Sequence, residues 1–249
     1  MGGLSAAHEL AERGFRVQVY ERNPHFGGKA RSIPVPGSGV GGRPDLPGEH
    51  GFRFFPGFYR HVTDTMARIP YPGNPRGVFD NLVTASRMLL ARTGAAPVEV
   101  PLRFPHSTGD LFTGLESLMR FTFAVPPHET LFYLSRLSVL LSSSDERRVT
   151  EYEHLPWWEF NRAAQMSPQY QQFLGQGFTR SLVAIRAEEA STRTAGYIGL
   201  QLAMGLVGLG PGVDRLLNGP TSTVWIDPWV AYLRSLGVEF HANAPVQAI

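Results

Sequence analysis

Residues 1–32, MGGLSAAHELAERGFRVQVYERNPHFGGKARS, decide how the rest of the chain is organised. This stretch contains, in order, a glycine start with small residues, a short amphipathic segment, an apolar strand that ends in an acid, and a glycine pair with basic residues. The order of these elements is typical of a chain that binds a dinucleotide.

The amphipathic segment is predicted to be a helix. Its apolar residues recur at spacings of three and four, which places them on one face. These residues are Leu4, Ala7, Leu10 and Ala11. Gly14 follows directly after Arg13 and is expected to end the helix in a left-handed conformation, because glycine has no Cβ to oppose it.

A strand is predicted after this helix, because Phe15, Val17 and Val19 alternate with polar residues up to Glu21. In dinucleotide-binding units the start of the helix faces a pyrophosphate, since its free N–H groups and its dipole favour an anion. An acid about 20 residues further on binds a ribose hydroxyl. Gly3 and Glu21 fit these two roles.

The fingerprint of such units, G-x-G-x-x-G after a buried strand, is present only in part. Met1, Gly2 and Gly3 supply its last three positions. We therefore expect the first strand and the first two glycines to lie upstream of residue 1. The alternative is an ordinary helix that follows a flexible glycine start.

A second motif, Gly27-Gly28-Lys29-Ala30-Arg31, lies six residues beyond Glu21. Together the two motifs resemble the FAD-binding N-terminus of the flavin amine oxidase and phytoene desaturase superfamily. The resemblance implies that Gly3 lies at the start of the helix, that Glu21 binds the adenosine ribose, and that the glycine pair and Arg31 lie near the phosphates. Two glycines allow close backbone approach, and Arg pairs with phosphate oxygens bidentately.

Two further segments are similar to the same family. Residues 48–57, GEHGFRFFPG, resemble the stretch that runs beside the isoalloxazine ring, and Val246, three residues before Ile249, matches a valine that meets the adenine. Alternatively, the Phe residues of this segment belong to the core. The resemblance thus implies the following FAD-binding residues: Gly2, Gly3, Glu21, Arg22, Gly27, Gly28, Lys29, Ala30, Arg31, Glu49, Gly51, Phe52 and Val246.

The fold class implied is α/β, a Rossmann-like FAD/NAD(P)-binding sheet with a largely helical substrate domain inserted. The expected domains are 1–106 (FAD-binding, first part), 107–220 (helical substrate segment) and 221–249 (return to the FAD-binding domain). Enzymes of this family continue through a second half of the substrate domain and a C-terminal return to the sheet. We therefore expect a chain incomplete at both ends that holds FAD weakly or not at all.

The middle of the chain is predicted to be helical. Its apolar run, 131–141, is interpreted as a buried helix. The small residues between 195 and 205 allow either close helix packing or room for a long apolar ligand.

Near the end, Asp227 is expected to cap a helix that ends at Gly237. A strand then follows, and another is expected to begin at Pro245.

Composition excludes several classes of function. The net charge of +2, the pI of about 9.1 and the lack of a lysine-arginine run argue against nucleic acid as a partner. The chain has no Cys, so disulfides and thiolate metal sites are excluded, and its eight His residues lack ligand spacing. No apolar run reaches the ~18 residues that a membrane span needs. We expect a cytoplasmic protein and leave peripheral membrane contact open.

The function expected from the resemblance is transfer of a hydride from substrate to flavin. The cofactor supplies the chemistry and the protein supplies orientation, so the sequence does not indicate a catalytic residue. A small apolar substrate of carotenoid or terpenoid type is favoured, with amine oxidation, an inactive fragment and NAD binding as alternatives. Neither the electron acceptor nor the oligomeric state is predicted.

Overall fold

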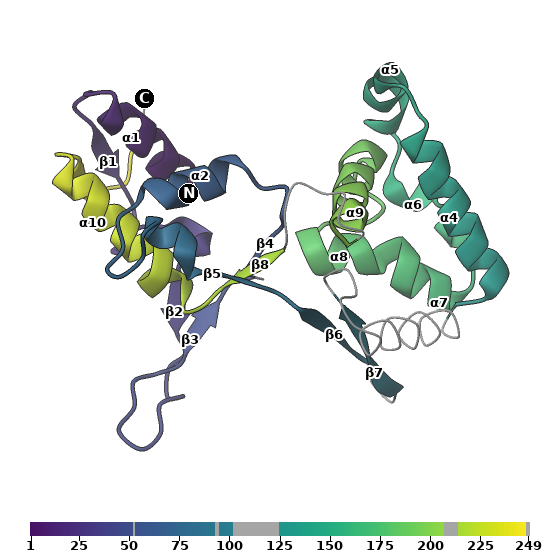
Figure 1. Cartoon of the computed structure of the whole chain (residues 1–249), viewed down its shortest axis with the longest axis horizontal. Coiled ribbons are helices and arrows are strands. Elements are labelled where there is room, and N and C mark those ends of the chain that lie inside the picture. Colours follow the sequence, from purple (N-terminus) through teal and green to yellow (C-terminus); the bar gives the residue numbers. More distant parts are fainter. Residues whose placement is uncertain (52, 93–94, 102–124, 207–213, 248–249) are drawn as a thin grey trace. The chain divides into compact units, whose positions relative to one another are not determined.

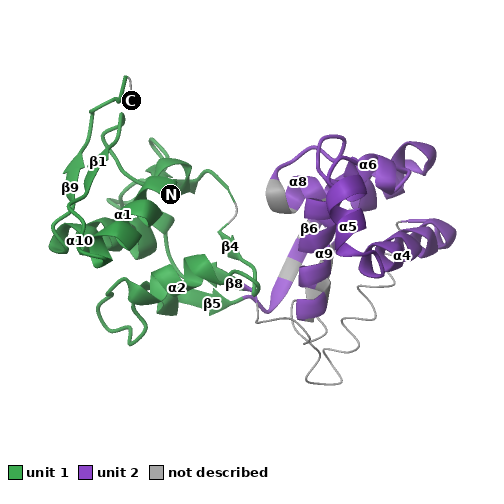
Figure 2. Cartoon of the chain, turned by 90° about the horizontal axis from the view of Figure 1, so that it is seen from above, with its two compact units in different colours: residues 1–84, 215–249 green, residues 85–214 purple. Residues whose placement is uncertain are grey.

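The computed structural model describes residues 1–51, 53–92, 95–101, 125–206 and 214–247. These residues form two compact units, unit 1 with residues 1–84 and 215–249, and unit 2 with residues 85–214 (Figure 2). The domain boundaries expected from the sequence, at 106/107 and 220/221, stay a prediction.

Unit 1 begins with helix α1, Gly2–Glu12 (Figure 1). Gly14 has a φ of 84° and donates its N–H to the carbonyl of Ala11, which confirms the predicted helix end. The buried face differs from the prediction at one position. Leu10 is 42% exposed, whereas His8 is fully buried because both of its ring nitrogens have partners within the unit.

Strand β1, Gln18–Tyr20, pairs in parallel with β9, Glu239–His241. Backbone hydrogen bonds extend this pairing, since Glu239 N–H donates to Val17 O at 3.0 Å and Glu21 N–H donates to His241 O at 2.9 Å. Phe15 was predicted as a strand residue, but it belongs to the turn that ends α1 and is 60% exposed. The strand therefore begins later than the alternating pattern indicates.

Helix α10, Asp227–Ser235, lies directly before β9 and continues a π-helical turn, η6, Ser222–Ile226. Because Ile226 already has helical backbone angles, the expected capping role of Asp227 is wrong. The predicted helix end is confirmed, since Gly237 has a φ of 86° and donates to the carbonyl of Arg234.

The other elements of unit 1 are short. Strands β2 and β3, at the two ends of a proline- and glycine-rich segment, pair antiparallel, and β4, β8 and β5 form a three-stranded antiparallel sheet. Their bounds are η1 Gly28–Ala30, β2 Ser32–Pro34, β3 Pro47–Glu49, β4 Phe54–Phe55, α2 His61–Arg68, η2 Gly77–Asn81, β5 Leu82–Thr84 and β8 Arg215–Leu217.

The core of unit 1 lies where α1, α2 and the η6–α10 segment pack together. Met66, Ile69 and Leu233 are fully buried there. The rings of Trp225 and Trp229 stack with their centroids 6.1 Å apart. The core thus joins the first quarter of the chain to its last 30 or so residues and sets the position of the segments described below.

Unit 2 consists of a β-hairpin and a set of helices. Its elements are β6 Arg87–Arg92, β7 Ala95–Pro101, α4 Pro127–Leu141, α5 Asp145–Arg147, η3 Arg148–Tyr152, α6 Trp157–Phe160, η4 Ala163–Gln165, α7 Pro168–Tyr170, η5 Gln171–Gln176, α8 Gly177–Val183 and α9 Thr192–Leu206. Residues 102–124, on which the predicted boundary at 106/107 falls, lie outside the described residues.

Helices α4 and α9 pack closely in unit 2. A Cβ at Gly196 would lie only 2.2 Å from Leu140 Cδ2, so close packing is the outcome for this small residue. The expectation that 131–141 is a buried helix is only partly right. Leu140 is 4% exposed, but Leu131 and Leu134 are 67% and 52% exposed, because one face of α4 lacks a partner among the described residues.

Candidate functional site

Glu21 follows the carboxyl end of β1, and its side chain is held by the next turn. Its Oε1 accepts hydrogen bonds from the backbone N–H of Asn23 at 2.9 Å and from Asn23 Nδ2 at 2.7 Å. The pKa of Glu21 lies below its ordinary value, chiefly because of the Asn23 backbone hydrogen bond and with smaller contributions from the positive charges of Arg22 and Arg31. Glu21 is thus an oriented carboxylate within the field of Arg31.

The chain that follows β9 runs beside Glu21. Ala244 N–H donates to Glu21 O at 2.9 Å, and Asn243 N–H donates to Asn23 O at 3.2 Å. Val246 lies two residues further on and is 60% exposed. The strand expected from position 245 is absent over 245–247, while 248–249 lie outside the described residues.

The glycine pair forms the start of η1, with Gly27 as its N-cap and Gly28 as its first residue. Gly27 has a φ of 102°, and a Cβ at this position would lie 2.8 Å from Ile226 Cγ2. Gly28 has a φ of 58° and open space around it. Gly27 is therefore required by both backbone conformation and packing, whereas Gly28 leaves the backbone accessible.

Arg31 lies beside the glycine pair. Its Nη1 donates to the carbonyl of Gly28 at 3.5 Å, and its positive charge makes a minor contribution to the lowered pKa of Glu21. Arg31 therefore contacts the glycine turn and lies within electrostatic range of Glu21. Gly2 and Gly3 lie exposed in the first turn of α1, which has no side-chain cap, and no hydrogen bond described for the chain connects them to Gly28 or Arg31.

The segment that follows the glycine pair borders two cavities of unit 1. Lys29 and Ala30 line a cavity of about 280 Å³, and the next two residues, Arg31 and Ser32, line a cavity of about 620 Å³. Neighbouring residues of a single short segment thus present a cation to each cavity. Lys29 is the only lysine of the chain.

The larger cavity lies between this segment and α10. It has a mixed charge, with two arginines, Arg31 and Arg234, and one acid, Asp227. Burial raises the pKa of Asp227, so this carboxylate is less readily ionised than usual. His25 and Phe26, which follow Glu21 closely in the sequence, line the same cavity.

The smaller cavity has aromatic walls and one ordered acid. Glu49 Oε1 accepts from Ser32 Oγ at 2.8 Å and from Thr221 N–H at 3.0 Å, and it lies 3.8 Å from Arg53 Nη1. Burial alone would raise the pKa of Glu49, but these hydrogen bonds and Arg53 outweigh it and hold the pKa below its ordinary value. The aromatic residues that line the cavity are Phe54, Phe55, Tyr59 and Trp225.

Of the residues expected near the flavin, Glu49 and Gly51 line this smaller cavity. Phe52 lies outside the described residues. Arg22 directly follows Glu21 and is exposed. Five cavity-lining residues were not predicted from the sequence: Ser32, Arg53, Thr221, Trp225 and Arg234. Arg53 was in a segment already singled out, but the last three are far away in the sequence and no spacing connects them to the glycine motif.

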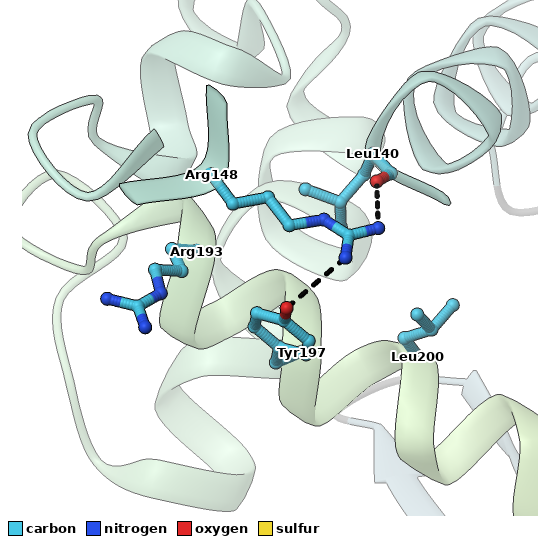
Figure 3. A pocket seen from close by; sticks show the side chains of 5 residues that line it. All are labelled: Leu140, Arg148, Arg193, Tyr197 and Leu200. Carbon is cyan, nitrogen blue, oxygen red and sulfur yellow. Dashed lines mark hydrogen bonds between the residues drawn. The ribbon is translucent and has the colours of Figure 1, made fainter. Parts of the chain in front are cut away.

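Unit 2 contains a much smaller cavity between α4, η3 and α9 (Figure 3). Arg148 donates from Nη1 to Tyr197 Oη at 3.2 Å and from Nη2 to Leu140 O at 3.1 Å. The volume of this cavity is about 10 Å³, so the cavity holds at most about one water molecule. This cavity therefore does not bind a substrate.

The described residues contain no group of three or more His, Asp or Glu residues placed to hold a metal ion. No helix in the described ranges has the length and the apolar character that crossing a bilayer would require.

Comparison with known proteins gives the family. The model of the flavin-containing amine oxidoreductases matches residues 1–249. Among solved structures, an oxidoreductase from Methanosarcina mazei has a TM-score of 0.53 at 14% sequence identity; the likeness covers 98% of this chain and 49% of that one, so this chain spans about half of its length. No curated protein sequence matches. The chain belongs to the flavin-containing amine oxidoreductases, a family that binds FAD.

Proposed function

We propose that residues 1–249 contribute the FAD-binding part of an oxidoreductase that removes a hydride from its substrate. The observation that carries this proposal is that Arg31, which donates to Gly28 O and lines the larger cavity, also contributes to the lowered pKa of Glu21. A carboxylate and a cation in each other's field match the two polar parts of a dinucleotide, which are its ribose hydroxyls and its diphosphate.

The residues have distinct roles in this proposal. Glu21 accepts from hydroxyl groups of the adenosine ribose, and Arg31 pairs with the diphosphate. Gly28 allows the backbone to approach the phosphates, and the free N–H groups of Gly2 and Gly3 provide further donors at the start of α1. The Rossmann-like form of the sheet belongs to the proposal too, with the parallel pair β1–β9 in its support.

The remaining members of the proposed set support these groups. Lys29 and Ala30 line the smaller cavity together with Glu49 and Gly51. Val246 follows a segment that is hydrogen-bonded to Glu21. When bound, FAD supplies the hydride acceptor, and the protein's own contribution is to bind it, orient the substrate and keep water away.

We further propose an apolar substrate, of carotenoid or terpenoid type. What supports this class is the exposed face of α4, where Leu131, Leu134 and Leu141 are 67%, 52% and 52% exposed and no charged residue lies between them on that face. Such a face suits contact with a lipid surface in which an apolar substrate dissolves. Peripheral membrane contact stays a prediction, as do a cytoplasmic location and the absence of nucleic acid as a partner.

Amine oxidation is the second candidate. It is favoured by the family's description and by the smaller cavity, where aromatic rings stand beside the carboxylate of Glu49. Aromatic faces and a carboxylate both attract a cationic amine. The two candidates differ in the substrate, while the FAD-binding residues are the same in both.

The proposal is tested by titrating the full chain with FAD and following flavin fluorescence. Wild-type protein should bind FAD weakly but measurably, and Arg31→Ala should weaken binding further by about tenfold or more, since a charge-assisted pair is lost. Arg186→Ala is the matched control, because Arg186 is an exposed arginine of unit 2 paired with Glu189. A chain that binds NAD but not FAD, or neither, contradicts the proposal.

The substrate class is tested on the FAD-loaded protein under anaerobic conditions. Loss of the visible flavin absorbance with a carotenoid precursor or squalene in lipid vesicles, but not with benzylamine or spermine, supports the apolar class. The reverse result supports amine oxidation. No reduction by either class indicates that this chain is catalytically inactive alone.

A further inference from the structure

We infer that His8 is an acid-sensitive connection between α1 and α10: a second proton on its ring breaks the hydrogen bond with Trp229 and loosens the two helices from each other. The inference concerns unit 1 itself and does not depend on FAD binding. It starts from a buried histidine that the proposed function does not use.

His8 is fully buried, and both nitrogens of its ring have partners. Nδ1 accepts a hydrogen bond from Trp229 Nε1 at 2.8 Å, and Nε2 lies 2.9 Å from Glu12 Oε1. The indole nitrogen can only donate, and an ionised carboxylate can only accept. The neutral ring with its proton on Nε2 is therefore the one form that satisfies both neighbours.

A second proton can enter this ring only at Nδ1. There it would face the N–H of Trp229, so that two donors meet with no acceptor between them. The indole has no room to turn toward another acceptor, because Trp229 is 1% exposed and its ring stacks on that of Trp225 with the two planes 6° apart. A second proton on His8 and the hydrogen bond to Trp229 thus exclude each other.

The charges around His8 do not replace the lost bond. Glu12 attracts a cationic ring, but its Oε1 already accepts from Nε2 of the neutral ring and from Tyr232 Oη at 3.0 Å. Its Oε2 is paired with Arg68 Nη1, which offsets much of its charge. The titratable and charged groups described around the ring and Glu12 are Glu9 and Arg13 on α1, Asp64 and Arg68 on α2, and Tyr232 on α10.

The hydrogen bond joins the two ends of the chain inside one core. His8 and Trp229 are 221 positions apart in the sequence. Leu4 of α1 and Leu233 of α10 are buried in the same apolar cluster, and α10 leads directly into β9, the partner of β1. Loss of the bond therefore weakens the packing of the first helix of the chain against the last.

The test measures urea unfolding of the full chain from pH 8 to pH 5. A histidine of the unfolded chain takes up a proton below about pH 6.5, whereas the ring bonded to Trp229 does not, so stability falls as the pH falls. Between pH 6.5 and 5.5 the unfolding constant of the wild type should rise about threefold to tenfold more than that of His8→Asn. In this variant an amide oxygen replaces Nδ1 as the acceptor and has no proton to gain.

His61→Asn is the matched control. His61 is an exposed histidine of unit 1 at the start of α2, so its replacement should leave the pH dependence of the wild type in place. Parallel pH curves for the wild type and His8→Asn overturn the inference. Equal flattening of the curve by His8→Asn and His61→Asn also overturns it, because the effect would then not belong to the buried ring.

A second readout uses wild-type protein alone and does not depend on the folding of a variant. Long-range ¹⁵N NMR spectra follow the protonation of His8 Nδ1, and the indole N–H signal of Trp229 follows the hydrogen bond. During acid titration the two signals should change at the same pH. An indole N–H that keeps its hydrogen-bonded chemical shift after Nδ1 has gained a proton overturns the inference.

Discussion

His8 Nδ1, on α1, accepts a hydrogen bond from Trp229 Nε1, on α10, at 2.8 Å. Because the indole nitrogen can only donate, Nδ1 of His8 carries no proton, and the proton of the neutral ring lies on Nε2, which is 2.9 Å from Glu12 Oε1. Both side chains are buried. This bond ties the first helix of the chain to the helix that leads into β9 and so holds β1 and β9 in register.

Removing the indole donor should therefore destabilise unit 1. Trp229→Phe leaves His8 Nδ1 buried without a partner, and we expect a loss of about 1–3 kcal/mol in the free energy of unfolding. Urea unfolding followed by circular dichroism measures this. Trp225→Phe is the comparison, since its indole N–H has no partner among the described residues, and it should cost less. Equal losses from the two variants would show that the hydrogen bond to His8 contributes nothing.

The two glycines at the start of η1, Gly27 and Gly28, should respond differently to substitution. Both have positive φ, which costs an alanine about 1–2 kcal/mol. Only Gly27→Ala also creates a contact of 2.8 Å with Ile226, and overpacking of this kind adds about 1–3 kcal/mol. Thermal unfolding should show Gly27→Ala to be the less stable variant. If Gly28→Ala is as unstable, the packing described for Ile226 is wrong.

The lowered pKa of Glu49 predicts a pH dependence of stability. The unfolded carboxyl group, with a pKa near 4.5, takes up protons at a higher pH than the folded one. The contribution of Glu49 is therefore complete above 4.5 and is lost as the pH falls below this value through the folded pKa. Glu49→Gln should be less stable than wild type at pH 7, and the difference should shrink at acidic pH. A difference that stays constant down to pH 2 would contradict the prediction.

Two leucines of helix α4 in unit 2 should differ sharply in how much their replacement by alanine destabilises the protein. Leu140 is buried against Gly196, so Leu140→Ala leaves a cavity and should cost about 2–5 kcal/mol. Leu131 is 67% exposed, and Leu131→Ala should change stability by no more than about 0.5 kcal/mol. Chemical unfolding of both variants measures the two values. A large loss from Leu131→Ala would mean that the exposed face of α4 is covered in solution.

The glycines that follow α1 and α10 in the sequence correctly predicted where these two helices end. Gly14 and Gly237 end α1 and α10 because each adopts the positive φ that only glycine tolerates easily. The start of α10 was missed, because the backbone from Ser222 is already helical in a π-turn that carries no capping signal. The buried face of α1 was also predicted incorrectly, because His8 is buried and Leu10 is not. The hydrogen bonds of His8 with Trp229 and Glu12 favour its burial, and the apolar spacing of the sequence does not reveal these bonds.

The candidate site was predictable only where its residues are close in sequence. Glu21, Gly28 and Arg31 lie within a dozen residues, and Arg31 donates a hydrogen bond to Gly28 O, but the binding role that the motif indicates for the three residues stays a prediction. Trp225 lies nearly 200 residues later and reaches the smaller cavity through the packing of η6 and α10 on unit 1. The position of a side chain from a distant segment depends on tertiary contacts, and a single sequence does not reveal those contacts.

The central claim is that this chain binds a dinucleotide through Glu21. The most direct measurement is the dissociation constant of FAD for the wild-type full chain and for Glu21→Ala, with FMN, which lacks the adenosine ribose, as the comparison ligand. The account predicts that Glu21→Ala binds FAD at least about tenfold more weakly and binds FMN as the wild type does. Equal affinity of both proteins for FAD would contradict it.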